Sequence, residues 1–136
     1  MLTSDNTQDE DAIRELVENW ANAVRRKDLS AILLNHSANM LMFDVPPPLA
    51  SKGIEAYSKT WDLFFSWAHD PIVFNICEMD ITAGDDVAFV MALMRCAGTE
   101  SNGQASELDF RLTIGLRKIE DQWVVVHEHH SIPATH

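Results

Sequence analysis

Four strand-like segments follow one another in the second half of the chain, and this run of strands constrains the fold more than any other feature. The segments are IVFNICEMDIT (72–82), VAFVMALMRCA (87–97), ELDFRLTIGLRKI (107–119) and WVVVHEHH (123–130). They are rich in β-branched and aromatic residues, and the short turn sequences AGDD, ESNG and EDQ separate them. Because short turns join antiparallel neighbours, the pattern predicts an antiparallel meander whose last two strands form a hairpin.

The first half of the chain predicts helices and one short strand. Residues 7–27 carry apolar side chains at helical spacing. Asp28 can cap a second, shorter helix, and NMLMFDV (39–45) predicts a strand that the prolines at 46–48 end. A third helix is expected after Gly53. Helices followed by a meander indicate an α+β domain, with the helices packed on one face of a curved sheet.

Length and charge limit the classes of function. The 136 residues suit one domain, residues 1–136, and 10 basic against 21 acidic residues give a formal charge of −11. This charge argues against nucleic acid or an anionic membrane as a partner, because binding to phosphate needs a positive surface. No apolar run approaches the roughly 20 residues of a membrane span. The polar, acidic start of the chain is unlike a secretory signal, so we expect a cytoplasmic protein.

The segment VAFVMALMRCA is apolar on both of its alternating faces. One face carries Val87, Phe89, Met91 and Leu93, and the other carries Ala88, Val90, Ala92 and Met94. A strand with one face in water alternates apolar with polar residues instead. If the helices cover one face, a second subunit can cover the other, so we expect a homodimer through the outer face of the sheet.

The last two strand segments carry a distinctive set of residues: RLT (111–113), Trp123, VHEH (126–129), Ser131 and Pro133. This set is similar to the final hairpin of SnoaL-like and ketosteroid isomerase-like proteins, which belong to the nuclear transport factor 2-like superfamily. It is also similar to the association domain of calmodulin-dependent kinase II. Upstream, FDVPPPLASKG (43–53) resembles the segment of ketosteroid isomerases that carries their catalytic aspartate.

The resemblance covers nearly the whole chain and implies a fold and a site. The implied fold is a cone-shaped, curved antiparallel sheet wrapped around N-terminal helices, which is nuclear transport factor 2-like or cystatin-like. Asp44 matches the place of the isomerases' general base, and no cofactor is implied. The isomerases' tyrosine falls at Trp20 and their aspartic acid near Leu112, so steroid isomerisation is not implied. Arg95 and Arg111 match pocket arginines of the association domain.

Strand alternation predicts which side chains share the interior of this cone. Residues two apart lie on one face, so His127 and His129 go with Trp123, while Glu128 and His130 point the other way. The predicted pocket residues are Trp20, Asp44, Trp61, Met91, Arg95, Asp109, Arg111, His127 and His129. An apolar pocket with a few convergent polar groups is typical of a small-molecule site. Because guanidinium groups bind carboxylates, a small organic acid or a polar-tipped apolar ligand fits this set best.

Other interpretations of the same residues stay open. Arg111 can pair with Asp109 or Glu107, and the histidines can form internal hydrogen bonds. Two imidazoles on one strand face, His127 and His129, can also chelate a metal. A stable site needs three or four ligands, and no second pair stands at ligand spacing, so we expect no metal.

Two functions from different classes are compatible with the sequence. In the first, the protein is a cofactor-independent isomerase, cyclase or hydratase that acts on a small, partly apolar ligand bearing a carboxylate or carbonyl group. Asp44 or His129 is then the general base, and Arg111 stabilises a developing oxyanion. In the second, the chain is a non-catalytic ligand-binding or oligomerisation domain, and Asp44 is structural.

Overall fold

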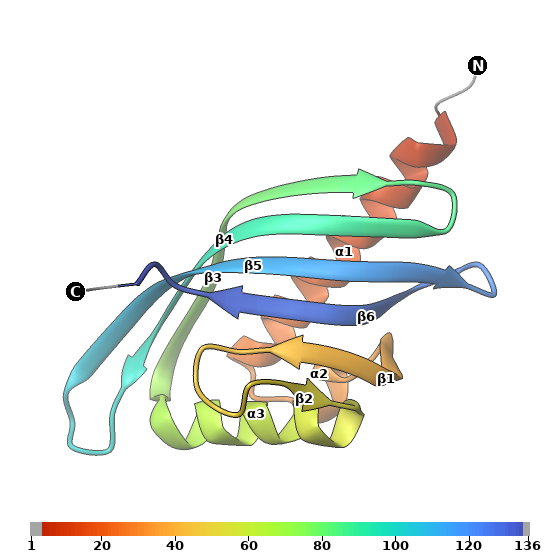
Figure 1. Cartoon of the computed structure of the whole chain (residues 1–136). Helices are drawn as coiled ribbons and strands as arrows, with labels where there is room; N and C mark the ends of the chain where they lie inside the picture. Colours follow the sequence, from red (N-terminus) through yellow and green to blue (C-terminus); the bar gives the residue numbers. More distant parts are fainter. Residues whose placement is uncertain (1–3, 135–136) are drawn as a thin grey trace.

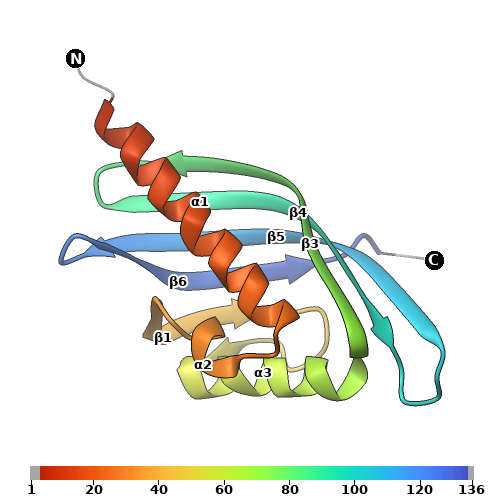
Figure 2. The same ribbon diagram turned by 180° about the vertical axis from the view of Figure 1, so that it is seen from behind.

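The computed structural model describes residues 4–134 as a curved sheet with helices on one face (Figures 1 and 2). The elements are α1 (Ser4–Arg25), α2 (Leu29–Ile32), β1 (His36–Phe43), β2 (Ser51–Lys52), α3 (Ile54–Trp67), β3 (His69–Ala83), β4 (Val87–Thr99), β5 (Ala105–Ile119) and β6 (Gln122–Ser131). We call the helix-covered side of the sheet its inner face and the opposite side its outer face. The predicted α+β architecture with a curved sheet is confirmed.

The strand order is β2-β1-β6-β5-β4-β3. The last four strands form the predicted antiparallel meander, with Ile119 paired to Gln122 at the β5–β6 turn. β1 extends the sheet by pairing with β6 in parallel, and the short strand β2 pairs antiparallel with β1. The sheet curls at one end. The start of β3, the end of β4 and the start of β5 bend toward α3 in both views (Figures 1 and 2).

The helices form where the apolar spacing predicts them. α1 crosses the inner face (Figure 2) and buries Ile13, Val17 and Val24 against the sheet. It starts and ends earlier than the predicted range 7–27. The Asp28 side chain caps α2 by accepting the Ala31 N–H at 3.2 Å, which satisfies one of the free donors of the helix start.

β4 alternates between the two faces along its whole length. Its inner residues, among them Val90 and Met94, are buried in the core. Its outer residues Val87, Phe89, Met91 and Leu93 are 44–56% exposed. The helices of the chain therefore cover only one face of the sheet, and an apolar row lies open on the other.

β6 does not alternate in this simple way, because a β-bulge interrupts its pairing with β5. Gly115 pairs with His127, whereas Leu116 pairs with Val125, so Val126 is an extra residue. A bulge shifts the phase of all residues that follow it. Trp123 and Val125 are buried before the bulge, and Glu128 and His130 are buried after it. The predicted faces of the histidine segment are therefore exchanged.

No helix among residues 4–134 has the length and apolar character needed to cross a membrane.

Candidate functional site

A cavity of about 580 Å³ lies between α3 and the curled part of the inner face. Its walls include Asp44, Val45 and Pro46–Pro48 after β1, Lys59, Trp61, Phe64 and Trp67 of α3, Phe74, Cys96 and Phe110 of the sheet, and His130 of β6. The volume falls in the range of small-molecule sites, and most of the lining side chains are apolar. The geometry therefore suits a compact, largely apolar molecule.

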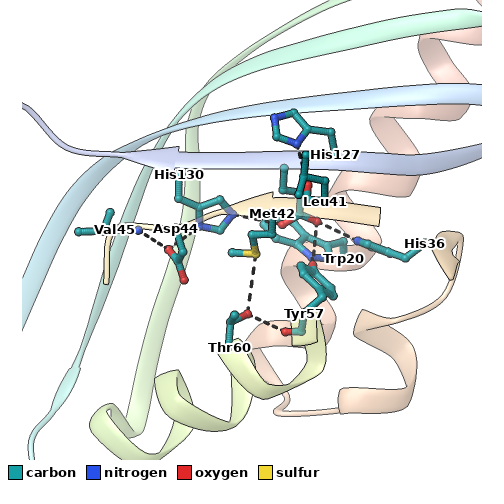
Figure 3. Close-up of polar contacts among 11 residues, drawn as sticks. Trp20, His36, Leu41, Met42, Asp44, Val45, Tyr57, Thr60, His127 and His130 are labelled. Atoms are coloured by element: carbon teal, nitrogen blue, oxygen red, sulfur yellow. Dashed lines mark hydrogen bonds and ion pairs between the residues drawn. The ribbon is translucent and has the colours of Figure 1, made fainter. Parts of the chain in front are cut away.

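Asp44 and His130 form the polar part of this wall. The Nδ1 atom of His130 lies 3.7 Å from Oδ1 of Asp44, and the two side chains point toward one another (Figure 3). Asp44 is 22% exposed and His130 is 8% exposed. The backbone N–H of Val45 donates to Oδ1 of Asp44 at 2.8 Å, which holds that carboxyl in place. A carboxylate beside an imidazole at a sheltered cavity wall can exchange protons with a bound molecule.

Glu128 lies behind His130 and is fully enclosed. Its Oε1 atom is 3.1 Å from Nε2 of His130, and its Oε2 atom is 2.8 Å from Nε2 of His36. The Tyr57 hydroxyl donates to Oε2 at 2.7 Å, and the Trp20 indole N–H donates to that hydroxyl oxygen at 3.0 Å. Figure 3 shows how these side chains from α1, β1, α3 and β6 converge. Each oxygen of the buried carboxylate therefore has a partner, which is the condition for keeping a charge inside a core.

Burial and hydrogen bonding act in opposite directions on Glu128. Burial alone would raise the pKa of this carboxyl, but the hydrogen bonds of His130 and His36 outweigh burial and lower the pKa to about 2. Glu128 is therefore a carboxylate at neutral pH. Burial, together with the charge of Glu128, raises the pKa of Tyr57 well above its usual value, so Tyr57 keeps its proton and donates.

Aromatic rings form the rest of the enclosure around His130. The imidazole stacks on Phe110 with ring centroids 5.3 Å apart, and Trp61 approaches at 6.5 Å. The Trp61 Nε1 atom is buried and has no hydrogen-bond partner among residues 4–134.

Cys96 lines the cavity without being a suitable nucleophile. Burial, with smaller effects of Asp109 and Asp44, raises the pKa of this thiol to about 11. Because the thiolate is the reactive form, Cys96 serves as an apolar part of the wall.

Three residues predicted for the site lie in or beside the cavity. Asp44 and Trp61 line it. Trp20 is buried next to Trp61, with ring centroids 5.8 Å apart, and donates to Tyr57. The Asp44 side chain is sheltered but still reaches solvent.

The other predicted pocket residues lie on the outer face, so their placement in the interior is corrected. These are Met91, Arg95, Asp109, Arg111, His127 and His129. In β4 and β5 the other alternating set of side chains faces inward. In β6 the bulge at Val126 exchanges the two faces for the residues that follow it. The predicted roles of these residues in ligand binding, and of Arg111 and His129 in catalysis, stay predictions. None of these residues lines the cavity.

On the outer face these polar residues contact one another. Arg95 pairs with Asp109 at 2.9 Å and approaches Glu107 at 3.9 Å. The Arg111 Nε–H donates to Oγ of Ser131 at 3.1 Å rather than pairing with either acid. His127 faces the carbonyl oxygen of Leu41 through Nδ1 at 2.7 Å.

The sequence interpretation missed the residues behind and opposite Asp44: His36, Tyr57, Lys59, Glu128 and His130. One signal points to the two residues of β6. An isolated glycine inside a strand often marks a bulge, and Gly115 lies directly opposite the extra residue. His36 and Tyr57 come from elements that meet β6 only in the folded chain.

Within residues 4–134, no three His, Cys, Asp or Glu side chains gather as they would around a metal ion. His127 and His129 have ring centroids 6.2 Å apart on the outer face.

A curved α+β sheet around helices, with an internal cavity at its curled end, defines a protein of the nuclear transport factor 2-like superfamily. The family described as the SnoaL-like domain matches residues 13–135. The chain therefore belongs to the SnoaL-like domain family.

Solved structures agree with this assignment. An NTF2-like protein from Pseudomonas putida KT2440 is 32% identical with a TM-score of 0.81, covering 98% of this chain and 89% of that one. The association domain of C. elegans CaMKII is 20% identical with a TM-score of 0.74, covering 96% and 100%. A ketosteroid isomerase-like protein from Erwinia carotovora atroseptica SCRI1043 is 18% identical with a TM-score of 0.75, covering 88% and 92%. The latter two share the fold alone. No curated protein matches the chain.

Proposed function

We propose that the cavity binds a small, mainly apolar molecule with a carbonyl or carboxylate group, and that Asp44 and His130 move a proton on it without a cofactor. The observation that carries the proposal is the Asp44–His130 pair on the wall of an otherwise apolar cavity. Enclosed pairs of titratable groups are typical of acid–base sites.

The reaction that this pair supports is a proton shift next to a carbonyl. The Asp44 carboxylate takes a proton from the carbon beside the carbonyl, and the electron pair of that C–H bond moves to form an enolate. Return of that proton to a different carbon, directly from Asp44 or after it has passed from Asp44 to Nδ1 of His130, gives the isomer and restores both side chains. Each proton removed is replaced, so the step needs no other reactant.

Lys59 favours an anionic group on the same ligand. It is the only lysine or arginine among the described residues that line the cavity. We therefore expect Lys59, rather than Arg95 or Arg111, to contact a carboxylate of the ligand, since both arginines lie on the outer face.

Hydrogen–deuterium exchange tests the proton shift without knowledge of the substrate. A panel of small cyclic and aromatic ketones and keto acids is incubated with the protein in D₂O, and loss of the proton signal beside the carbonyl is followed by NMR. We expect exchange with at least one member, and Asp44→Asn should slow it by about 100-fold or more. Asp11→Asn, the same change at an exposed position of α1, is the control. Equal exchange rates for wild type and Asp44→Asn would contradict the proposal.

Association of two copies is a second candidate function, and the open row on β4 favours it. Val87, Phe89, Met91 and Leu93 form this row. Acidic Glu78 and Asp80 of β3 lie on one side of it, and basic Arg111 and Arg117 of β5 lie on the other. A two-fold axis that runs along the row, parallel to β4, would bring the acidic side of one copy onto the basic side of the other. We propose a homodimer through this face.

Met91→Glu tests the homodimer. A buried charge in the centre of the interface should convert a dimer to a monomer in sedimentation-velocity experiments. Leu34→Glu is the matched control, because Leu34 is 65% exposed and lies in the turn before β1, outside the row on β4. A wild-type monomer at high protein concentration would exclude this interface, and so would a Met91→Glu variant as dimeric as wild type.

A further inference from the structure

The imidazole of His130 lies between two carboxyl groups, and each faces a different ring nitrogen. Nε2 is 3.1 Å from Oε1 of Glu128, and Nδ1 is 3.7 Å from Oδ1 of Asp44. We propose that Glu128 is the positioning residue of the site: it retains the proton on Nε2 of His130, so that Nδ1 is the nitrogen that gains and loses protons at the cavity. The catalytic part of this inference rests on the proposed proton shift.

Glu128 can only accept hydrogen bonds in this arrangement. The Tyr57 hydroxyl donates to it, and burial holds Tyr57 in its protonated form. Nδ1 of His36 faces the carbonyl oxygen of Leu34 at 2.8 Å, and Nε2 of the same ring faces Glu128. A carbonyl oxygen can only accept, so Nδ1 of His36 carries a proton, and Nε2 of that ring also donates to Glu128 when the ring is doubly protonated. The partner of His130 is thus a fully engaged carboxylate, and the nitrogen that faces it carries the proton.

The surroundings prevent His130 from choosing another orientation. Stacking on Phe110 fixes the plane of the ring, with an interplanar angle of 22°. Rotation within that plane would move Nε2 away from Glu128 and leave a buried carboxylate oxygen without its donor, which costs free energy. Glu128 thereby decides which edge of the ring faces Asp44.

The two ring nitrogens of His130 therefore have different roles. Nε2–H is present whether the imidazole is neutral or charged, since its acceptor does not change. Nδ1 is bare in the neutral ring and protonated in the charged ring, and only this nitrogen faces Asp44 and the cavity wall. Without the carboxylate of Glu128, the proton of the neutral ring would move to Nδ1, where Asp44 can accept it.

The tautomer of His130 can be measured directly. Long-range ¹H–¹⁵N NMR of the imidazole rings assigns which nitrogen carries the proton. In the wild type at a pH where His130 is neutral, we expect the proton on Nε2. In Glu128→Gln, whose side chain can donate as well as accept, we expect a shift toward the Nδ1–H tautomer. Glu18→Gln, the same change at an exposed position of α1, should leave His130 unchanged.

Activity supplies a second readout once an exchanging ketone is known. Glu128→Gln should lower kcat by on the order of 100-fold, as expected when a catalytic imidazole adopts the wrong tautomer, with KM within about twofold of the wild type. Tyr57→Phe should keep the Nε2–H tautomer, because Glu128 remains. If Glu128→Gln does not fold, the wild-type spectrum alone decides.

The outcomes separate this inference from the proposed function. A wild-type ring protonated on Nδ1, or an unchanged tautomer in folded Glu128→Gln, would overturn the positioning role even if Asp44→Asn abolishes exchange. Absence of exchange with every ketone would instead overturn the proton shift, while the tautomer measurement would still test Glu128.

Discussion

The two faces of β6 put adjacent residues of the HEHH segment into different chemical settings. On the inner face, His130 contacts the carboxylate of Glu128 and faces Asp44 across 3.7 Å. On the outer face, His127 faces a backbone carbonyl, and its ring packs edge-on against Phe43 with centroids 4.9 Å apart. Neither His127 nor His129 pairs with a carboxylate among residues 4–134.

This difference shows that the environment, not the residue type, decides what a histidine contributes. Inside the core, water is excluded, so electrostatic interactions are strong and a missing partner is expensive. On the exposed side, solvent replaces lost contacts and the same ring has little influence on stability. Three measurements test whether the two faces of β6 differ in this way.

The largest effect is expected from removing the inner carboxylate. Glu128→Ala leaves His36, His130 and Tyr57 without their shared acceptor, so the free energy of unfolding should fall by about 3 to 5 kcal/mol. His129→Ala, one residue further along on the outer face, should cost about 1 kcal/mol or less, including its contact with Phe43. Urea unfolding followed by tryptophan fluorescence measures both. Similar losses for the two variants would remove the distinction between the faces.

The inner face should also dominate the response to acid. Glu128 has a pKa of about 2 in the folded protein against an ordinary value of 4.5, so between these values the unfolded chain takes up a proton that the folded chain does not. Stability therefore rises with pH in this window and is lost as the pH falls from about 5 toward 2, with a slope of up to about 1.4 kcal/mol per pH unit from this group. Urea titrations at several pH values measure the slope. The slope should be shallower in Glu128→Gln, and parallel curves would show that another group is responsible.

A small loss of stability is expected from replacing His127, the outer histidine whose ring hydrogen-bonds to the backbone. His127→Ala removes one partly buried hydrogen bond to the carbonyl oxygen of Leu41, which should cost about 1 kcal/mol. The His130 ring signals in NMR should not move, because the two side chains lie on opposite faces. A loss above about 2 kcal/mol, or a displaced His130 signal, would show that the faces are coupled through the strand.

Most of the architecture could be predicted because it follows from local patterns. The change from helical spacing to strand-like segments at about residue 71, the cap at Asp28 and the EDQ turn are each set by a few neighbouring residues. The parallel pairing of β1 with β6 could not be predicted from such patterns, because it joins residues that are about 90 positions apart, such as His36 and Val125.

The candidate site was predicted only in part, and for an identifiable reason. Asp44, which matches the isomerases' aspartate, and Trp61 are predicted site residues that line the cavity, and their roles stay predictions. The sequence predicts His130 and Glu128 on the opposite face. The three successive valines in WVVVHEHH give no indication of the residue at which the inward and outward side chains exchange. Equally apolar neighbours on both sides of the strand carry no signal of the extra residue.

The bulge at Val126 also determines how this strand must be compared with its relatives. A homologue without the extra residue reaches the inner glutamate one position sooner after the hairpin turn. An ungapped alignment of the two sequences would then match an inward side chain of one protein with an outward side chain of the other. Columns in this strand correspond only when a one-residue gap in the homologue is aligned with Val126. Substitutions counted without that gap would mix the variation of the cavity wall with that of the outer surface.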